Sequence, residues 1–141
     1  MKGKTECDFP PELHYDRTHN WARVEGDVVV QGMTAFGQRL AGEIIYVEPA
    51  AVGRKVKQGQ PIFSIESGKW VGRINAIVGG EIVAFNTDLD AQPDLVNKEP
   101  YGRGWMVRIR PDNLEADLAR LGRPDDEYRR FLDSERQRYG M

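Results

Sequence analysis

The sequence predicts an all-β fold, a flattened barrel or sandwich with short helices and a helical tail at its C-terminal end. Short runs of β-branched and aromatic residues recur over residues 13–111, and turn residues such as glycine, asparagine and proline separate them. The tetrapeptide Gly42–Ile45 recurs almost unchanged as Gly80–Val83, and each copy opens a predicted strand. We therefore expect two related β-units with approximate two-fold symmetry.

The predicted strands begin with a meander and share a high content of β-branched and aromatic residues. They span residues 13–15, 21–24, 28–30, 42–47, 60–65, 71–74, 81–85 and 105–109. A glycine-rich, basic connection over 52–59 and a polar stretch over 86–99 separate some of them. Within the β-rich part, Thr34 can cap a short helix that reaches Leu40, and Pro93–Asn97 can form one helical turn.

Beyond residue 111 the pattern becomes helical. Leucines recur at helical spacing over Leu114–Leu121, with Asp112 or Asn113 as N-cap and Gly122 as the stop. A second helix is predicted from Asp125 to about residue 139, after a proline. Three of its side chains are expected to pack on the β-rich part: Tyr128, Phe131 and Leu132.

The chain therefore divides into three parts. Residues 1–12 are expected to be a flexible N-terminal segment, because Pro10 and Pro11 block regular structure. Residues 13–111 form the predicted domain, and residues 112–141 form a C-terminal helical extension packed on it.

The composition is that of a soluble globular protein, with 40% hydrophobic and 30% charged residues among 141. A net charge of −2 argues against a nucleic-acid surface. No apolar run approaches the ~20 residues that cross a membrane, and no secretory signal is recognisable. Cys7 has no second cysteine to pair with, so a cytoplasmic location is expected, with Cys7 inert rather than reactive.

The stretch 62–74 is the most informative part of the chain. Strand-forming residues flank a polar centre, Glu66-Ser67-Gly68-Lys69, followed by Trp70. This pattern predicts a hairpin that exposes Lys69 at its tip, with Gly68 as a residue that tolerates positive φ. Taken alone, such a lysine is most simply an ordinary solvated turn residue.

Residues for catalysis are scarce. The two histidines, His14 and His19, lack the arrangement of further ligands that a zinc site needs. No nucleophile elbow, phosphate-binding loop or dinucleotide fingerprint occurs. A small β-domain with one presented lysine is typical of a carrier without catalytic residues of its own, in which Lys69 is the covalent attachment point. A group tethered there visits several active sites at a high effective concentration.

From Leu13 to Pro111 the sequence resembles the H protein of the glycine cleavage system, a lipoylated carrier. The matching motifs are His19-Asn20-Trp21, Gly42–Glu48, Ile65–Lys69, Gly80–Val83, Pro93–Asn97 and Pro100–Trp105. The resemblance implies a hybrid barrel-sandwich fold of the lipoyl and biotinyl type, and lipoic acid covalently attached to Lys69. Glu66, Ser67, Gly68 and Trp70 surround that lysine and complete the cofactor-binding candidates.

Departures from the family pattern affect the interpretation, and one of them is the segment 75–80, where the family usually has Ser-Pro-Val-Ser-Gly. Gly68 replaces a usual valine, Trp70 a usual alanine, and Asn20 a usual glutamate. These changes resemble the H-like lipoate-binding proteins of the heterodisulfide-reductase-like sulfur-oxidation pathway. The favoured interpretation is therefore an arm on Lys69 that shuttles sulfur-containing intermediates and reducing equivalents. Its implied partners are a lipoate-protein ligase or lipoyl-transfer machinery, the heterodisulfide-reductase-like complex and dihydrolipoyl dehydrogenase.

Two alternatives stay open. The first is the H protein of glycine cleavage itself, carrying an aminomethyl group between glycine decarboxylase and aminomethyltransferase. The second is an unmodified interaction module in which Lys69 is only a turn residue. Biotin attachment is less favoured, because biotin sites usually present Met-Lys-Met. A monomer without nucleic-acid partners or membrane insertion is expected in each case.

Overall fold

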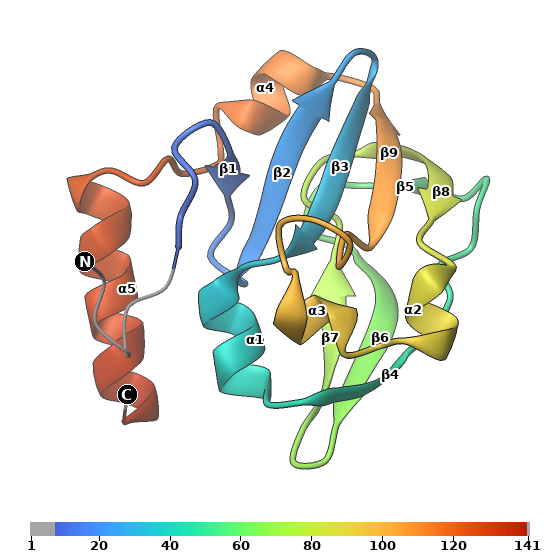
Figure 1. Cartoon of the computed structure of the whole chain (residues 1–141). Helices are drawn as coiled ribbons and strands as arrows, with labels where there is room; N and C mark the ends of the chain where they lie inside the picture. The colour runs from blue at the N-terminus through green and yellow to red at the C-terminus, as the bar shows by residue number, and fades with distance from the viewer. Residues whose placement is uncertain (1–7, 141) are drawn as a thin grey trace.

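The fold is built on two antiparallel sheets, seen in a computed structural model that describes residues 8–140 (Figure 1). The larger sheet has the order β1-β2-β3-β9-β8-β5 and the smaller one β4-β6-β7. The strands of the larger sheet are β1 (His14–Tyr15), β2 (Asn20–Glu25), β3 (Val28–Met33), β5 (Lys55–Val56), β8 (Gly80–Phe85) and β9 (Val107–Pro111). Those of the smaller sheet are β4 (Ile44–Val47), β6 (Pro61–Ser67) and β7 (Val71–Asn75).

The main core contains apolar side chains from both sheets, such as Ile65 of β6, Ile82 of β8 and Ile109 of β9. The predicted mostly-β fold is confirmed, but the sheets do not close into a barrel. The two sheets stay separate: β1 and β5 are the edge strands of the larger sheet, and β4 and β7 are the edge strands of the smaller one. The two copies of the repeated tetrapeptide lie at the starts of β4 and β8, in different sheets.

Residues 8–140 also contain five short or medium helices: α1 (Ala35–Ala41), α2 (Asp88–Ala91), α3 (Leu95–Lys98), α4 (Leu114–Leu118) and α5 (Asp126–Tyr139). Thr34 caps α1 as predicted, because its hydroxyl oxygen accepts a hydrogen bond from Gly37 N at 3.0 Å. Likewise Asn113 caps α4 and Asp125 caps α5. Within residues 8–140, no helix is long and apolar enough to cross a membrane.

Helix α4 is shorter than the leucine spacing predicts. It ends at Leu118 instead of continuing to Gly122. Gly122 pairs instead with Tyr15 of β1 through two backbone hydrogen bonds of 2.7 and 2.8 Å. The chain thus returns to the edge of the larger sheet before α5 begins.

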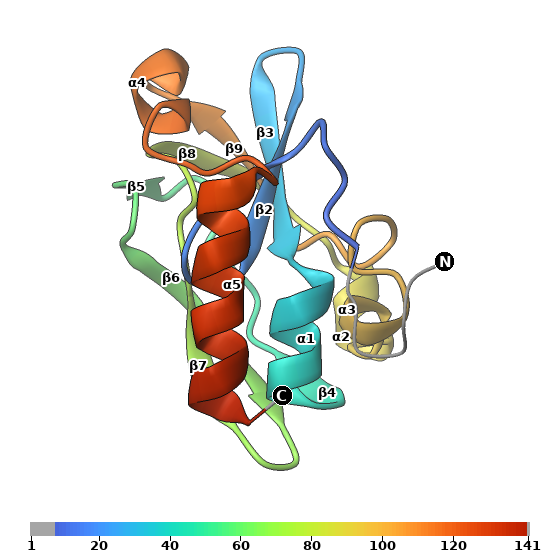
Figure 2. The ribbon, with the colours of Figure 1, turned by 90° about the vertical axis from the view of Figure 1, so that its left-hand side faces the viewer.

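A second core lies between α5 and one side of the larger sheet, and α5 runs beside α1 (Figure 2). We call it the α5 cluster; its buried members are Leu13, Tyr15, Trp21, Val30, Phe36, Tyr128 and Leu132. The predicted packing of Tyr128 and Leu132 is thereby confirmed, and Phe131 packs against the cluster while partly buried. Cys7, for which the sequence favours an inert role, lies outside the described residues.

Two elements escape the sequence patterns. Strand β5 lies in the connection over 52–59, and α2 lies in the polar stretch over 86–99. Two residues are too few to show a periodicity, and β5 exists only because Lys55 and Val56 pair with Glu81 and Gly80 of β8. Helix α2 is a single turn of four residues.

Candidate functional site

Lys69 is exposed at the tip of the β6–β7 hairpin, as the sequence predicts. The turn is tight: Ser67 N donates to Trp70 O at 2.8 Å, so that only Gly68 and Lys69 lie between the paired residues. The hairpin projects from the lower end of the molecule in Figure 1, beyond the ends of the helices around it. The tip of the hairpin therefore lies outside both cores.

The turn does not use the positive φ that Gly68 would tolerate. Gly68 is not among the residues with positive φ, and neither is Lys69. A β-carbon at position 68 would have no other atom within 4 Å. The turn therefore accommodates a side chain at position 68, and glycine is not required there by the backbone.

Ser67 ties the hairpin to helix α1. Its hydroxyl donates to the carbonyl oxygen of Ala41, the last residue of α1, at 2.6 Å. The same oxygen lies 3.3 Å from Lys69 N, which donates to it. Ser67 is buried, so this bond is shielded from competing water. The turn that carries Lys69 is consequently fixed to a helix from a distant part of the sequence.

Asn97 of α3 holds the segment on the other side of Lys69, a role that sequence reasoning missed. Its side-chain nitrogen donates to Gly42 O at 2.8 Å and to Gln38 Oε1 at 2.9 Å, and its oxygen accepts from Ile44 N at 2.8 Å. All three bonds fix the chain between α1 and β4. The only available signal was the place of Asn97 in the Pro93–Asn97 motif, which reveals no partner.

Gly42 supports the lysine stem directly. A β-carbon there would lie 2.8 Å from Cε of Lys69 and 3.6 Å from its Cγ and Cδ. Gly42 also has φ +87°, a conformation that side chains disfavour. The aliphatic part of Lys69 thus rests on the bare backbone of Gly42. Among residues 8–140, Lys69 has no ion-pair partner, so its amine is available to solvent.

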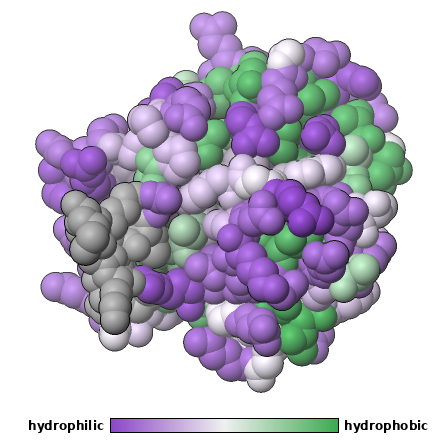
Figure 3. Space-filling model, in the orientation of Figure 1, coloured by the Kyte–Doolittle hydropathy of each residue, from purple (hydrophilic) through white to green (hydrophobic). Residues whose placement is uncertain are grey.

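Trp70 and Glu66 lie on opposite faces of the smaller sheet. The Trp70 ring covers Gly72, where a β-carbon would be 1.9 Å from ring atom Cζ2. Glu66 is in register with Tyr46 of β4 and Val71 of β7, on the outward face. Figure 3 shows hydrophobic side chains among polar ones at the lower edge of the molecule, where Figure 1 places β4.

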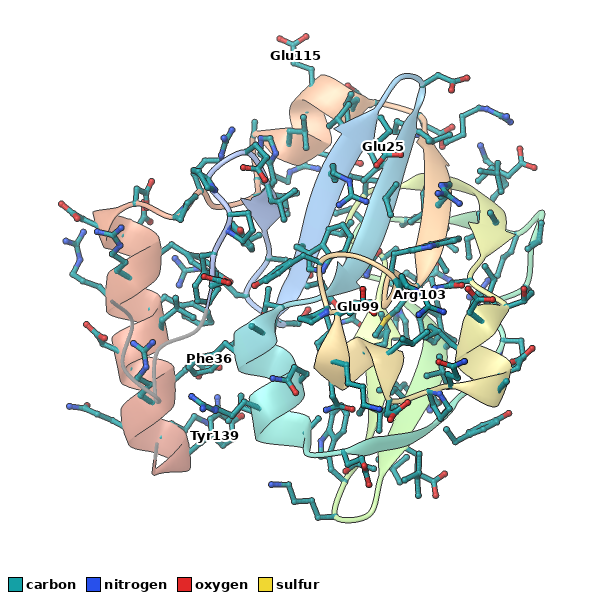
Figure 4. The ribbon with its side chains drawn as sticks, viewed as in Figure 1. Glu25, Phe36, Glu99, Arg103, Glu115 and Tyr139 are labelled. Carbon is teal, nitrogen blue, oxygen red and sulfur yellow. The ribbon has the colours of Figure 1, made fainter. Side chains whose placement is uncertain are left out.

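The two histidines have structural roles. His19 Nε2 lies 2.8 Å from Glu135 Oε1 of α5, and its ring packs between Phe36 and Phe131. Figure 4 shows Phe36 in the space between α1 and α5. His14 Nε2 lies 3.2 Å from Arg123, and burial, aided by that guanidinium, lowers the pKa of this histidine. No group of three metal-ligating side chains occurs in the described part of the chain.

Asn20, which departs from the family pattern, is locked in the turn between β1 and β2. Its side-chain nitrogen donates to Asp16 Oδ2 and to Thr18 Oγ1, both at 3.1 Å. Burial raises the pKa of Asp16, although hydrogen bonds from Asn20 and Thr18 oppose this effect. Asn20 therefore stabilises the turn that leads into His19.

Comparisons with known proteins point to one family. The family model described as glycine cleavage H-protein matches residues 13–135. The glycine cleavage system H protein of Acinetobacter baumannii is 46% identical over 114 residues, which is 81% of this chain and 91% of that protein. The corresponding protein of Rubrobacter xylanophilus is 41% identical over 129 residues, 92% of this chain and 98% of its own length.

A solved structure agrees with these matches. The crystal structure of a glycine cleavage system H protein from Mycobacterium marinum superposes with a TM-score of 0.70 at 29% identity. The match covers 74% of this chain and 87% of that one. Sequence and fold thus lead to the same family.

Proposed function

The chain belongs to the glycine cleavage H-protein family, whose members are lipoyl carriers rather than enzymes, and we propose that Lys69 is its attachment lysine. The observation that carries this proposal is the exposure of Lys69 on a tight turn that Ser67 fixes to α1. Its amine is free of ion pairs within the described residues. These features fit acylation of the lysine by a lipoyl group.

The residues around Lys69 present and orient the attached arm. A bound lipoyl group supplies a redox-active disulfide at the end of a long tether. Ser67 and Asn97 hold the two backbone segments beside the tether, and Gly42 leaves room for the lysine stem. A fixed base and a mobile arm give the carried group a high effective concentration at each partner.

We propose that the pathway is glycine cleavage. The relatives that match most of this chain are named as H proteins of that system, which supports glycine cleavage over the sulfur-oxidation interpretation favoured by the sequence. The partners would then be lipoate ligase, glycine decarboxylase, aminomethyltransferase and dihydrolipoyl dehydrogenase. The heterodisulfide-reductase-like complex has no support among these relatives.

We further propose that residues 13–111 are the carrier domain and that residues 112–141 extend it. The burial of Tyr128 and Leu132 of α5 in the α5 cluster supports this division. The extension would thus add stability to the domain without contributing to the lysine turn.

Attachment is tested by incubating the purified unmodified chain with lipoate ligase, ATP and lipoate, followed by intact mass and peptide mapping. One lipoyl increment is expected on the peptide that contains Lys69. Lys69→Arg keeps the charge and should abolish the increment, whereas the control Lys57→Arg, another exposed lysine, should leave it unchanged. A lipoylated Lys69→Arg protein would contradict the assignment and favour the unmodified module.

The pathway is tested by reconstitution. The lipoylated chain, mixed with glycine decarboxylase and labelled bicarbonate, is expected to support glycine-dependent exchange of carbon dioxide. Unmodified chain serves as the control and should support none. If the lipoylated chain is equally inactive while a bacterial H protein works in the same assay, glycine cleavage is the wrong pathway for this carrier.

A further inference from the structure

The outward face of the smaller sheet carries an unusual group of exposed apolar side chains. Ile45 is 52% exposed, Tyr46 51% and Val71 69%. The register of β4 against β6 shifts between Ile44 and Tyr46, and this irregularity turns two consecutive side chains of β4 outward. In a regular strand one of the two would face the core.

These side chains form one surface next to the lysine turn. Tyr46, Glu66 and Val71 are in register across β4, β6 and β7, and residues directly opposite each other share a face. We call Ile45, Tyr46, Glu66 and Val71 the outward patch. Lys69 follows Glu66 by three residues, and its stem rests on Gly42, close in sequence to Ile45.

The short reach of the unmodified Lys69 side chain indicates which partner enzyme must contact the outward patch. After lipoylation, the long arm lets a partner enzyme react without touching the hairpin closely. Before lipoylation, only the lysine stem is available, so the attaching enzyme must bring its active site to the turn itself. The residues in register next to the turn, Tyr46, Glu66 and Val71, then become buried against that enzyme.

We propose that the outward patch is the docking surface for the enzyme that lipoylates this chain, an inference that rests on Lys69 being the attachment lysine. The complementary surface of that enzyme is apolar, with a basic side chain opposite Glu66. The docked enzyme transfers the acyl group from an activated lipoyl donor. An amide bond forms between the acyl carbon and Nζ, the activating group leaves, and the amine releases a proton to water.

Steady-state lipoylation of unmodified chain by purified ligase, with ATP and lipoate saturating, tests the proposal. Tyr46→Thr and Val71→Thr remove apolar surface but keep residues that favour strands. Each is expected to raise KM for the carrier by about tenfold with little change in kcat, because docking precedes chemistry. Val52→Thr is the matched control and should leave KM unchanged. Val52 is 60% exposed and precedes β5, a strand that Figure 1 shows well away from the tip of the β6–β7 hairpin.

The outcomes separate this proposal from the function it rests on. Unchanged KM in both patch variants, with the parent chain lipoylated on Lys69, overturns the docking surface alone. No lipoylation of the parent chain overturns the attachment lysine as well. If the patch variants instead convert a sedimenting dimer to a monomer without altering KM, a second copy of the chain occupies the patch, and the proposal is wrong. Thermal unfolding of each variant verifies that it is folded.

Discussion

The β6–β7 hairpin that carries Lys69 and the α5 cluster are held by different interactions. The α5 cluster buries large aromatic rings, with Tyr15 and Tyr128 stacked at 5.5 Å and Phe9 packed edge-on against both. The hairpin tip is exposed and depends on a few hydrogen bonds, chiefly from Ser67 to Ala41. Burial of the aromatic rings stabilises the fold, whereas the hydrogen bonds of Ser67 determine the position of Lys69. Stability and presentation of the lysine should therefore respond to different substitutions.

The largest effect is expected in the α5 cluster. Tyr128→Ala removes a fully packed ring and should lower the free energy of unfolding by about 3 kcal/mol. Urea denaturation measures the loss. Lipoylation of Lys69, assayed where the variant is folded, should proceed at the parental rate. A much slower lipoylation of folded Tyr128→Ala would show that the two regions are not independent.

Tyr128→Phe is the matched control, because it retains the ring and removes only the hydroxyl. That hydroxyl donates to Asp16 O at 2.7 Å. Its loss should cost about 1 kcal/mol. A loss as large as that of Tyr128→Ala would mean that the hydrogen bond, not ring packing, dominates the cluster.

A smaller effect is expected where Asn97 holds the chain beside Lys69. Asn97→Ala removes three hydrogen bonds and leaves Ile44 N without its partner, so a loss of about 2 kcal/mol is expected. Hydrogen exchange at the Ile44 amide should accelerate in the variant. Gln38→Ala removes only one of the three bonds and should cost less than about 1 kcal/mol. Equal losses of stability in both variants would contradict the role of Asn97 in holding the chain between α1 and β4.

Little effect is expected from filling position 68. Gly68→Val should change the unfolding free energy by less than about 0.5 kcal/mol, because the space is open and φ is not positive. Gly42→Ala is the contrasting variant and should cost about 1 kcal/mol or more, since φ is +87° and the lysine stem occupies the space. A strongly destabilised Gly68→Val protein would restore the turn role first expected for that glycine.

The smallest effect concerns pH. Burial and Arg123 lower the pKa of His14 below its ordinary 6.5, so the folded state binds fewer protons than the unfolded state. The contribution of His14 to stability is therefore fully present above the pKa that this histidine has in the unfolded chain. It declines as the pH falls through that value towards the lower pKa of the folded state. The loss between about pH 7.5 and 5 should stay below ~0.5 kcal/mol, because solvent screens this partly exposed group. His14→Gln keeps an acceptor for Arg123 but does not titrate. A plot of the urea midpoint against pH should therefore be flatter for this variant than for the parent chain over the same pH range.

The sequence by itself determined the features that depend on neighbouring residues. The exposed Lys69, the Thr34 cap and most strands follow from local patterns of side-chain shape and hydrogen bonding. The family resemblance was equally readable, since it rests on short motifs. The pathway could not be determined from the sequence. Substitutions such as Trp70 show how this chain differs from its relatives, but they do not identify the enzymes that bind it.

Only the tertiary structure decided which distant segments meet. Strand β5 exists through its pairing with β8, Asn97 acquires its role by reaching Gly42, and His19 meets Glu135 across the α5 cluster. The separation of β4, β6 and β7 into a sheet of their own is likewise visible only in the tertiary structure. Such contacts arise from packing among residues far apart in the chain, and no local pattern encodes them.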